Sequence, residues 1–302
     1  MLTGLLEHAI LETLAYSDIF EYPLRLGEIH RYLTMQANRE QVAQSLSLLQ
    51  DQVGEREGFY FLAGREKIVE VRKQRTAYSK KLLPYAIRYG QLLGHLPFIR
   101  MAALTGSLAV MNGSKKADFD YMLVTARGRV WTARAFALLF NRFTRVFGHT
   151  LCPNLILSDA SLAWRSKDLY SARELYQMIP ITGFDVYQRL MNANAWVRDI
   201  FPNITPFSGN SMTQAGSLQS VLELPLRDGL GDRIERWEME RKIERLSKQA
   251  GFDEEVIFNA EMCQGNFDHH RQRTNKMLAG RLSRFNREVT DTLATTLTEI
   301  RS

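Results

Sequence analysis

The sequence predicts an α+β protein built from a helical N-terminal part with a β-hairpin, a central α/β part and a helical C-terminal region. Three helical patterns and two short strand-like runs fill residues 1–64. The order strand, Gly-Ser turn, strand, helix, strand follows in residues 95–167 and is typical of an α/β domain with a small mixed sheet. Residues 168–302 carry mostly helical spacing of apolar residues. A connecting helix is expected over residues 65–94.

The N-terminal part combines three helices with a hairpin. Apolar residues recur at helical spacing over residues 5–16 and 38–51, with a shorter helical pattern between them. Asn38 stands where a cap of the third helix is needed. The run VGEREGFYFLAGRE (53–66) then predicts two short strands around a glycine-containing turn. Together these elements resemble a winged helix.

DNA binding by this part is only weakly supported. In winged helices that bind DNA, the third helix contacts phosphates through Lys or Arg. Here that helix carries Arg39 as its only base, against Glu40 and Asp51. The basic residues of the connecting helix offer another contact surface, although a solvated helix face has the same pattern. Pro84 predicts a kink or break in that helix.

The central part contains three runs that predict strands. They are FIRMAAL (98–104), FDYMLVT (119–125) and LCPNLILS (151–158). A helical pattern lies between the second and the third.

Two short motifs lie around the first two of these strands. Gly106 and Ser107 follow the first strand, and glycine lets a backbone turn approach phosphate oxygens closely. Asp118 and Asp120 stand at the start of the second strand. Residues i and i+2 of a strand project from the same face, so the two carboxylates should converge. Two like charges so close favour a bound cation such as Mg²⁺.

This arrangement resembles the nucleotidyltransferase superfamily of the DNA polymerase beta type. The resemblance covers about 20 residues directly and extends to residues 95–200 as a domain. It implies that Gly106 and Ser107 hold the β,γ-phosphates of an NTP, while Asp118 and Asp120 hold Mg²⁺ ions. A hydroxyl acceptor on RNA, protein or a small molecule would then attack the α-phosphorus.

The superfamily also carries a third carboxylate on the next strand. In this sequence Asn154 stands where that acid is expected, and a neutral amide cannot act as a general base. Asp159, just beyond the strand, is the nearest substitute. Two hypotheses follow: either Asp159 serves as the third catalytic acid, or the protein is a catalytically weak nucleotide-binding, regulatory or adaptor protein. A structural protein with a chance motif is the third alternative.

Positive charge gathers in the same third of the chain. The net charge of +6 divides into +2 for residues 1–100, +5 for residues 101–220 and −1 for the remainder. Either a polyanionic ligand or a solvated basic surface accounts for this excess. Flanking bases that could contact a triphosphate are Lys115, Lys116, Arg127 and Arg129.

The remaining features concern compartment and linkers. The N-terminus has no basic region before its first acidic residues, and no run of about 18 apolar residues follows. A cytoplasmic protein with no membrane association is therefore expected. Two cysteines, Cys152 and Cys263, are too few for a disulfide framework and should be reduced and buried. Residues 204–220 are rich in Ser, Thr, Gly and Asn and predict a flexible loop.

Overall fold

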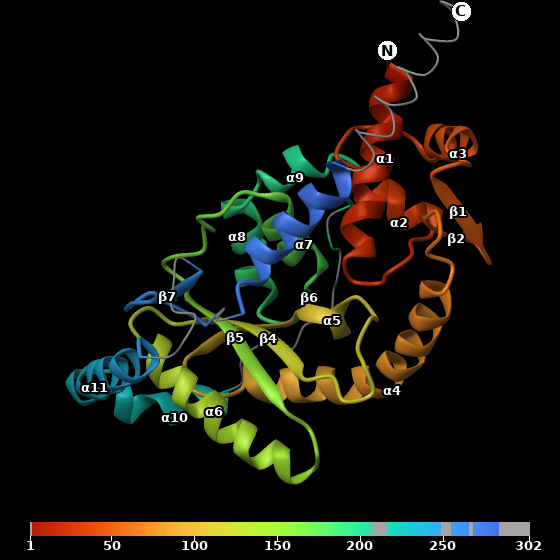
Figure 1. The fold of residues 1–302 in the computed structure, drawn as a ribbon. Helices are drawn as coiled ribbons and strands as arrows, with labels where there is room; N and C mark the ends of the chain where they lie inside the picture. The colour runs from red at the N-terminus through yellow and green to blue at the C-terminus, as the bar shows by residue number, and fades with distance from the viewer. Residues whose placement is uncertain (1, 206, 208–216, 249–254, 266–267, 284–302) are drawn as a thin grey trace, which may run out of the picture. The chain divides into compact units, whose positions relative to one another are not determined.

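A computed structural model divides the chain into two compact units, each assembled from segments far apart in the sequence (Figure 1). The first unit comprises Met1–Lys73, Arg198–Pro206 and His270–Ser302, and the second comprises Gln74–Val197 and Phe207–His269. The structure describes residues 2–205, 207, 217–248, 255–265 and 268–283. The predicted loop near 204–220 lies largely outside these residues, as does the end of the predicted C-terminal helix.

The first unit begins with the expected three helices and hairpin. The Asn38 side chain accepts a hydrogen bond from the Gln41 N–H at 2.8 Å, and the Gln41 side chain accepts one from the Asn38 N–H at 2.8 Å. This reciprocal cap fixes the start of the third helix. The hairpin turns at Glu57 and Gly58, whose φ values of 57° and 75° are those of a tight type I′ turn. The elements are α1 (Leu2–Asp18), α2 (Leu26–Arg31), α3 (Arg39–Leu48), β1 (Val53–Arg56) and β2 (Phe59–Leu62).

A helix over residues 270–283 completes the first unit, although it is distant in sequence. Its Arg281 Nε donates to one oxygen of the buried Asp18 carboxylate at 2.8 Å, and Arg65 Nε donates to the other at 2.6 Å. A buried carboxylate is tolerated when both oxygens are paired in this way. The fully buried core of the unit is apolar: Ile10, Leu24, Ile29, Leu33 and Val42.

Helix α4 (Ile68–Gly94) begins in the first unit and continues through the second. The expected break at Pro84 does not occur, because the helix runs through this residue. Contacts after the proline support the helix. The Tyr121 hydroxyl donates to the Ala86 carbonyl at 2.6 Å, and Gly90 has no Cβ that would collide with Ile181. Tertiary packing therefore outweighs the local cost of the proline.

The second unit is built on a six-stranded mixed sheet in the order β6-β3-β4-β5-β8-β7. The three predicted strands are confirmed as β3 (Ile99–Leu104), β4 (Phe119–Thr125) and β5 (Leu151–Ser158). β3 and β4 are antiparallel, whereas β4 and β5 are parallel. The described part of residues 168–302 is mostly helical, as predicted, but the prediction missed three strands that come from this region. They are β6 (Ile179–Thr182), β7 (Val256–Phe258) and β8 (Met262–Gly265).

Helices cover both faces of the sheet (Figure 1). α4 and α6 (Val130–Val146) pack on one face in a core that includes Tyr121 and Leu123. The alternate residues Met122 and Val124 are buried as well. Burial on both faces explains why residues 121–124 of β4 form an uninterrupted apolar run. Other helices of the chain are α5 (Gly106–Ala109), α7 (Leu169–Gln177), α8 (Phe184–Ala193), α9 (Val197–Ile200), α10 (Ser217–Glu223), the 3₁₀ helix η1 (Leu224–Leu226) and α11 (Gly229–Leu246).

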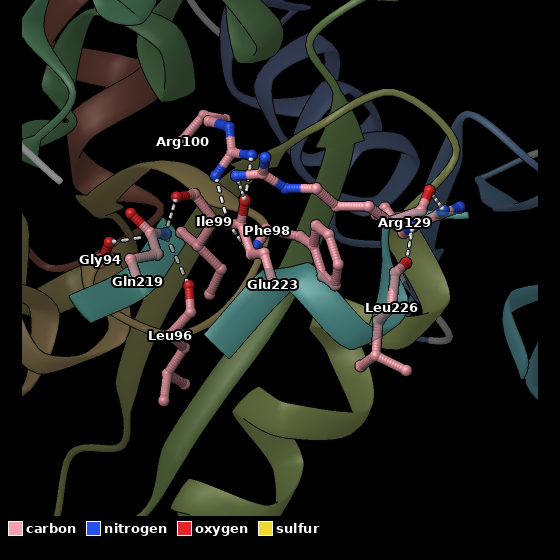
Figure 2. Close-up of polar contacts among 10 residues, drawn as sticks. Gly94, Leu96, Phe98, Ile99, Arg100, Arg129, Gln219, Glu223 and Leu226 are labelled. Carbon is pink, nitrogen blue, oxygen red and sulfur yellow. Dashed lines mark hydrogen bonds and ion pairs between the residues drawn. The ribbon is translucent and has the colours of Figure 1, made fainter. Parts of the chain in front are cut away.

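Helix α10 is attached to the turn between α4 and β3 by buried polar side chains (Figure 2). The Glu223 carboxylate accepts hydrogen bonds from the Phe98 N–H at 2.7 Å and from Arg100 at 2.7 and 3.0 Å. Gln219 Nε2 donates to the carbonyls of Leu96 and Ile99, both at 2.7 Å. Phe98 has a φ of 66°, so these contacts hold a backbone conformation that is unusual for a bulky residue.

Candidate active site

The antiparallel pairing of β3 and β4 brings the two sequence motifs together. Leu104 is the register partner of Tyr121, and the Thr105 N–H donates to the Asp120 carbonyl at 2.9 Å. The turn that follows β3 therefore lies beside the acids at the start of β4.

Gly106 makes close contact with the acid pair. Its φ is 65°, and a Cβ at this position would collide with the Asp120 carboxylate. Glycine is required here both for the backbone conformation and for the approach. The exposed Ser107 follows, and the fully buried Leu108 anchors the short helix α5. The turn thus presents Ser107 to solvent next to Asp120.

The two aspartates differ in their surroundings. Asp118 is exposed and precedes β4, whereas Asp120 is partly buried within the strand. Burial, and secondly the charge of Asp118, raise the pKa of Asp120 to about 7. Because a bound cation would stabilise the ionised forms of both acids, the pair is suited to a divalent ion. In the part of the chain that the structure describes, no group of three or more His, Cys, Asp or Glu residues is arranged to hold a metal. A cation at this site would need further ligands from substrate or water.

Cys152, not Asn154, lies opposite Asp120 on the next strand. Asp120 and Cys152 are register partners in the parallel pairing of β4 with β5, so their side chains share a face. Burial, followed by the charges of Asp120 and Asp118, raises the pKa of the Cys152 thiol to about 11. Asn154 falls in a register shift, between the partners of Tyr121 and Met122. The position opposite Asp120 on the next strand therefore carries a neutral thiol.

Glu174 of α7, which the sequence did not single out, is an acid close enough to Asp120 for their charges to interact. Burial raises the pKa of Glu174 to about 7, and the charge of Asp120 contributes to the shift. The sequence did contain a signal. Glu174 follows the buried Ser171 by three residues and precedes the buried Met178 by four, which places it on the buried side of an amphipathic helix. A carboxylate in that position requires an explanation.

The structure does not bring Asp159 to the acid pair. The Asp159 N–H donates to the carbonyl of Thr125, at the opposite end of β4 from Asp120. Thr125 is five residue steps along the strand from Asp120, which corresponds to about 17 Å. The Asp159 carboxylate instead lies 4.0 Å from Arg189. Asp159 is therefore misplaced for the role of third acid.

The flanking bases also separate into two groups. Lys115 and Lys116 are exposed in the turn immediately before Asp118, where they can contact an anion. Arg127 lies beyond the far end of β4. Arg129 is buried and donates to the carbonyls of Leu226 and Arg227 at 3.2 and 2.6 Å, so it has a structural role.

The loop between the motifs is fixed to α4. The Gly113 N–H donates to Ser79 Oγ at 2.9 Å, and the Thr76 hydroxyl donates to the Met111 carbonyl at 3.4 Å. These contacts limit the positions that the following Lys115 and Lys116 can reach.

Comparisons of the chain with protein-family models, with curated proteins and with solved structures gave no match. The structure itself shows a mixed α/β fold. In the described part of the chain, every helix is too short or too polar to cross a bilayer.

Proposed function

We propose that the protein is a Mg²⁺-dependent nucleotidyltransferase of the DNA polymerase beta type, which moves a nucleoside monophosphate from an NTP to a hydroxyl acceptor. The observation that carries this proposal is the contact of the Gly106 turn with the Asp120 carboxylate. It joins a turn able to approach phosphate to an acid pair able to bind a cation. The proposal includes a winged-helix assignment for residues 1–64. It also includes a cytoplasmic location, which suits the free thiols of Cys152 and Cys263.

We propose a role in the transfer reaction for each residue of the site. Asp118 and Asp120 hold the cation, which when bound would neutralise phosphate charge and polarise the α-phosphoryl group. Gly106 and Ser107 contact the terminal phosphates, and Lys115 or Lys116 offers a charge-assisted contact from the adjacent turn. The acceptor is a hydroxyl of RNA, of protein or of a small molecule.

We assign the role of general base to Glu174 in place of Asp159. A base works best when its pKa lies near the operating pH, and the pKa of Glu174 is raised to about 7. Its carboxylate would accept the proton of the acceptor hydroxyl as the oxygen attacks phosphorus and pyrophosphate leaves.

The test is release of pyrophosphate from each of the four NTPs in the presence of Mg²⁺ and a panel of acceptors. Asp118→Asn and Asp120→Asn should each lower the rate by at least about 100-fold, because the cation loses a charged ligand. If neither substitution changes the release, the enzymatic proposal is wrong.

A second candidate function is nucleotide binding with little turnover, as in a regulatory or adaptor protein. The specific observation in its favour is the thiol of Cys152 opposite Asp120, where the enzymes of this type carry an acid. Calorimetry with a non-hydrolysable NTP distinguishes the two. Binding that depends on Asp120, in a protein that releases no pyrophosphate, favours the second function.

A further inference from the structure

The outer face of α6 exposes an apolar stripe. Leu139, Phe143, Val146 and Phe147 are 63%, 60%, 81% and 59% exposed, at positions i, i+4, i+7 and i+8. The rings of Phe143 and Phe147 contact each other, with centroids 5.2 Å apart. A contiguous group of large apolar side chains in water is unfavourable for an unpartnered surface. We call these four residues the α6 stripe.

The α6 stripe continues toward α4. His149 follows the C-terminal end of α6, and its ring lies 5.0 Å from that of Tyr85 on α4. Tyr85 is 52% exposed. The two helices also touch beneath the surface, where the rings of Tyr89 and Phe140 are 6.1 Å apart. The exposed apolar surface therefore spans two neighbouring helices.

The charged residues that α6 and α4 contribute near the α6 stripe are basic. α11 also packs on α6 and carries acids, of which Glu235 accepts hydrogen bonds from the Trp131 and Thr132 N–H groups at the N-terminal end of α6. Residues 121–158 contain five arginines and no Asp or Glu. Arg142 and Arg145 are exposed on the same stretch of helix, adjacent in sequence to Phe143 and Val146. On α4, Lys81 and Arg88 are exposed, each about one helical turn from Tyr85. Residues 71–117 also contain no acid. An apolar stripe with a basic border is complementary to an anionic, amphipathic surface.

We propose that this face of α4 and α6 docks on a lipid bilayer with anionic headgroups. Phe143, Val146 and Phe147 would enter the boundary between headgroups and acyl chains, while the arginines contact lipid phosphates or carboxylates. The sequence-based expectation of no membrane association considered only a spanning helix. An interfacial helix needs an apolar side and a basic border, not a long apolar run.

Charge disfavours a second copy of the chain as the occupant. A twofold contact places the same patch against itself, so Arg142 and Arg145 would meet their counterparts with no acid on α6 to separate them. Nucleic acid pairs well with arginine, but it offers the aliphatic side chains of Leu139 and Val146 nothing to bury against.

The experiment is flotation of the full-length protein with vesicles of phosphatidylcholine alone or mixed with phosphatidylserine. We expect binding to the mixed vesicles only, weakened by high salt. The double variant Phe143→Ser/Phe147→Ser should lower binding by at least about tenfold, since each buried phenylalanine contributes about that factor. Arg142→Gln/Arg145→Gln should also lower it by at least about tenfold. Trp237→Ser, which removes a side chain 61% exposed on α11, is the matched control and should leave binding unchanged.

Three results would overturn the proposal. They are equal flotation with both kinds of vesicle, retained flotation in both double variants, and a dimer in sedimentation that the phenylalanine substitutions dissociate. Thermal unfolding checks that every variant folds, and the arginine pair tests the proposal even if the phenylalanine variant does not fold. Pyrophosphate release from soluble NTP should persist in the α6 variants, so failure of the docking proposal is separable from failure of the enzymatic one.

Discussion

Asp120 and Cys152 are register partners on adjacent parallel strands, so a carboxylate and a neutral thiol share one face of the sheet. Cys152→Asp would place a third acid opposite the pair. We expect it to tighten Mg²⁺ binding by about tenfold, because a further charged oxygen ligand becomes available. Titration calorimetry with Mg²⁺ measures this. Cys152→Ser, which adds no charge, is the control, and equal affinity in the two variants would contradict the prediction.

Asp120 should make stability depend on pH. Its folded pKa of about 7 lies above the ordinary 3.8, so the folded state binds a proton more tightly than the unfolded state. Stability is therefore lost as the pH rises from 3.8 toward 7. Asp120→Asn removes this loss. In EDTA, the unfolding free energy of the variant should exceed that of the unsubstituted protein. The difference should grow with pH to at most ~4 kcal/mol near pH 7 and stay constant above it. Thermal unfolding across this range provides the measurement, and a difference independent of pH would disprove the assignment.

Substitution of Glu174 should slow turnover, whereas substitution of Asp159 should not. Glu174→Gln should lower the rate constant of pyrophosphate release by at least about 100-fold and remove an ionisation near neutral pH from the rate profile, as expected for a lost general base. Asp159→Asn should leave both unchanged, because Asp159 lies beside Thr125 at the other end of β4. Steady-state kinetics from pH 6 to 9 compare the two. Loss of activity in the Asp159 variant alone would restore the original hypothesis.

Glu223 should stabilise the second unit through its contacts with Phe98 and Arg100 (Figure 2). Burial tends to raise the pKa of Glu223, but the hydrogen bonds from Arg100 and Phe98 outweigh it and hold the pKa below the ordinary value of 4.5. The contribution of Glu223 to the free energy of unfolding is thus present above pH 4.5. It is lost as the pH falls through the lower pKa of the folded state. Glu223→Gln should cost about 2 kcal/mol at neutral pH. Denaturant unfolding at neutral and acidic pH tests this, with the exposed Glu244→Gln on α11 as control.

Local sequence patterns predicted the central strands because each is rich in apolar residues. β3 and β4 bury most of their side chains and β5 buries half of them, so their composition alone identifies them. β6, β7 and β8 have three or four residues each, and so few positions give no period to detect. β6 also contains Pro180, which an edge strand accepts but which weakens a sequence-based prediction.

The amino-acid sequence alone identifies the two motifs and their order along the chain. The antiparallel pairing of the neighbouring strands β3 and β4 then brings Gly106 to Asp120. The tertiary structure sets which residues lie near Asp120 from the rest of the chain. This depends on the register of β5, where one extra residue moves Asn154 out of line and puts Cys152 beside Asp120. It also depends on α7, which brings Glu174 from more than fifty residues away. Pairing register and helix packing are set by the whole core, and no local pattern records them.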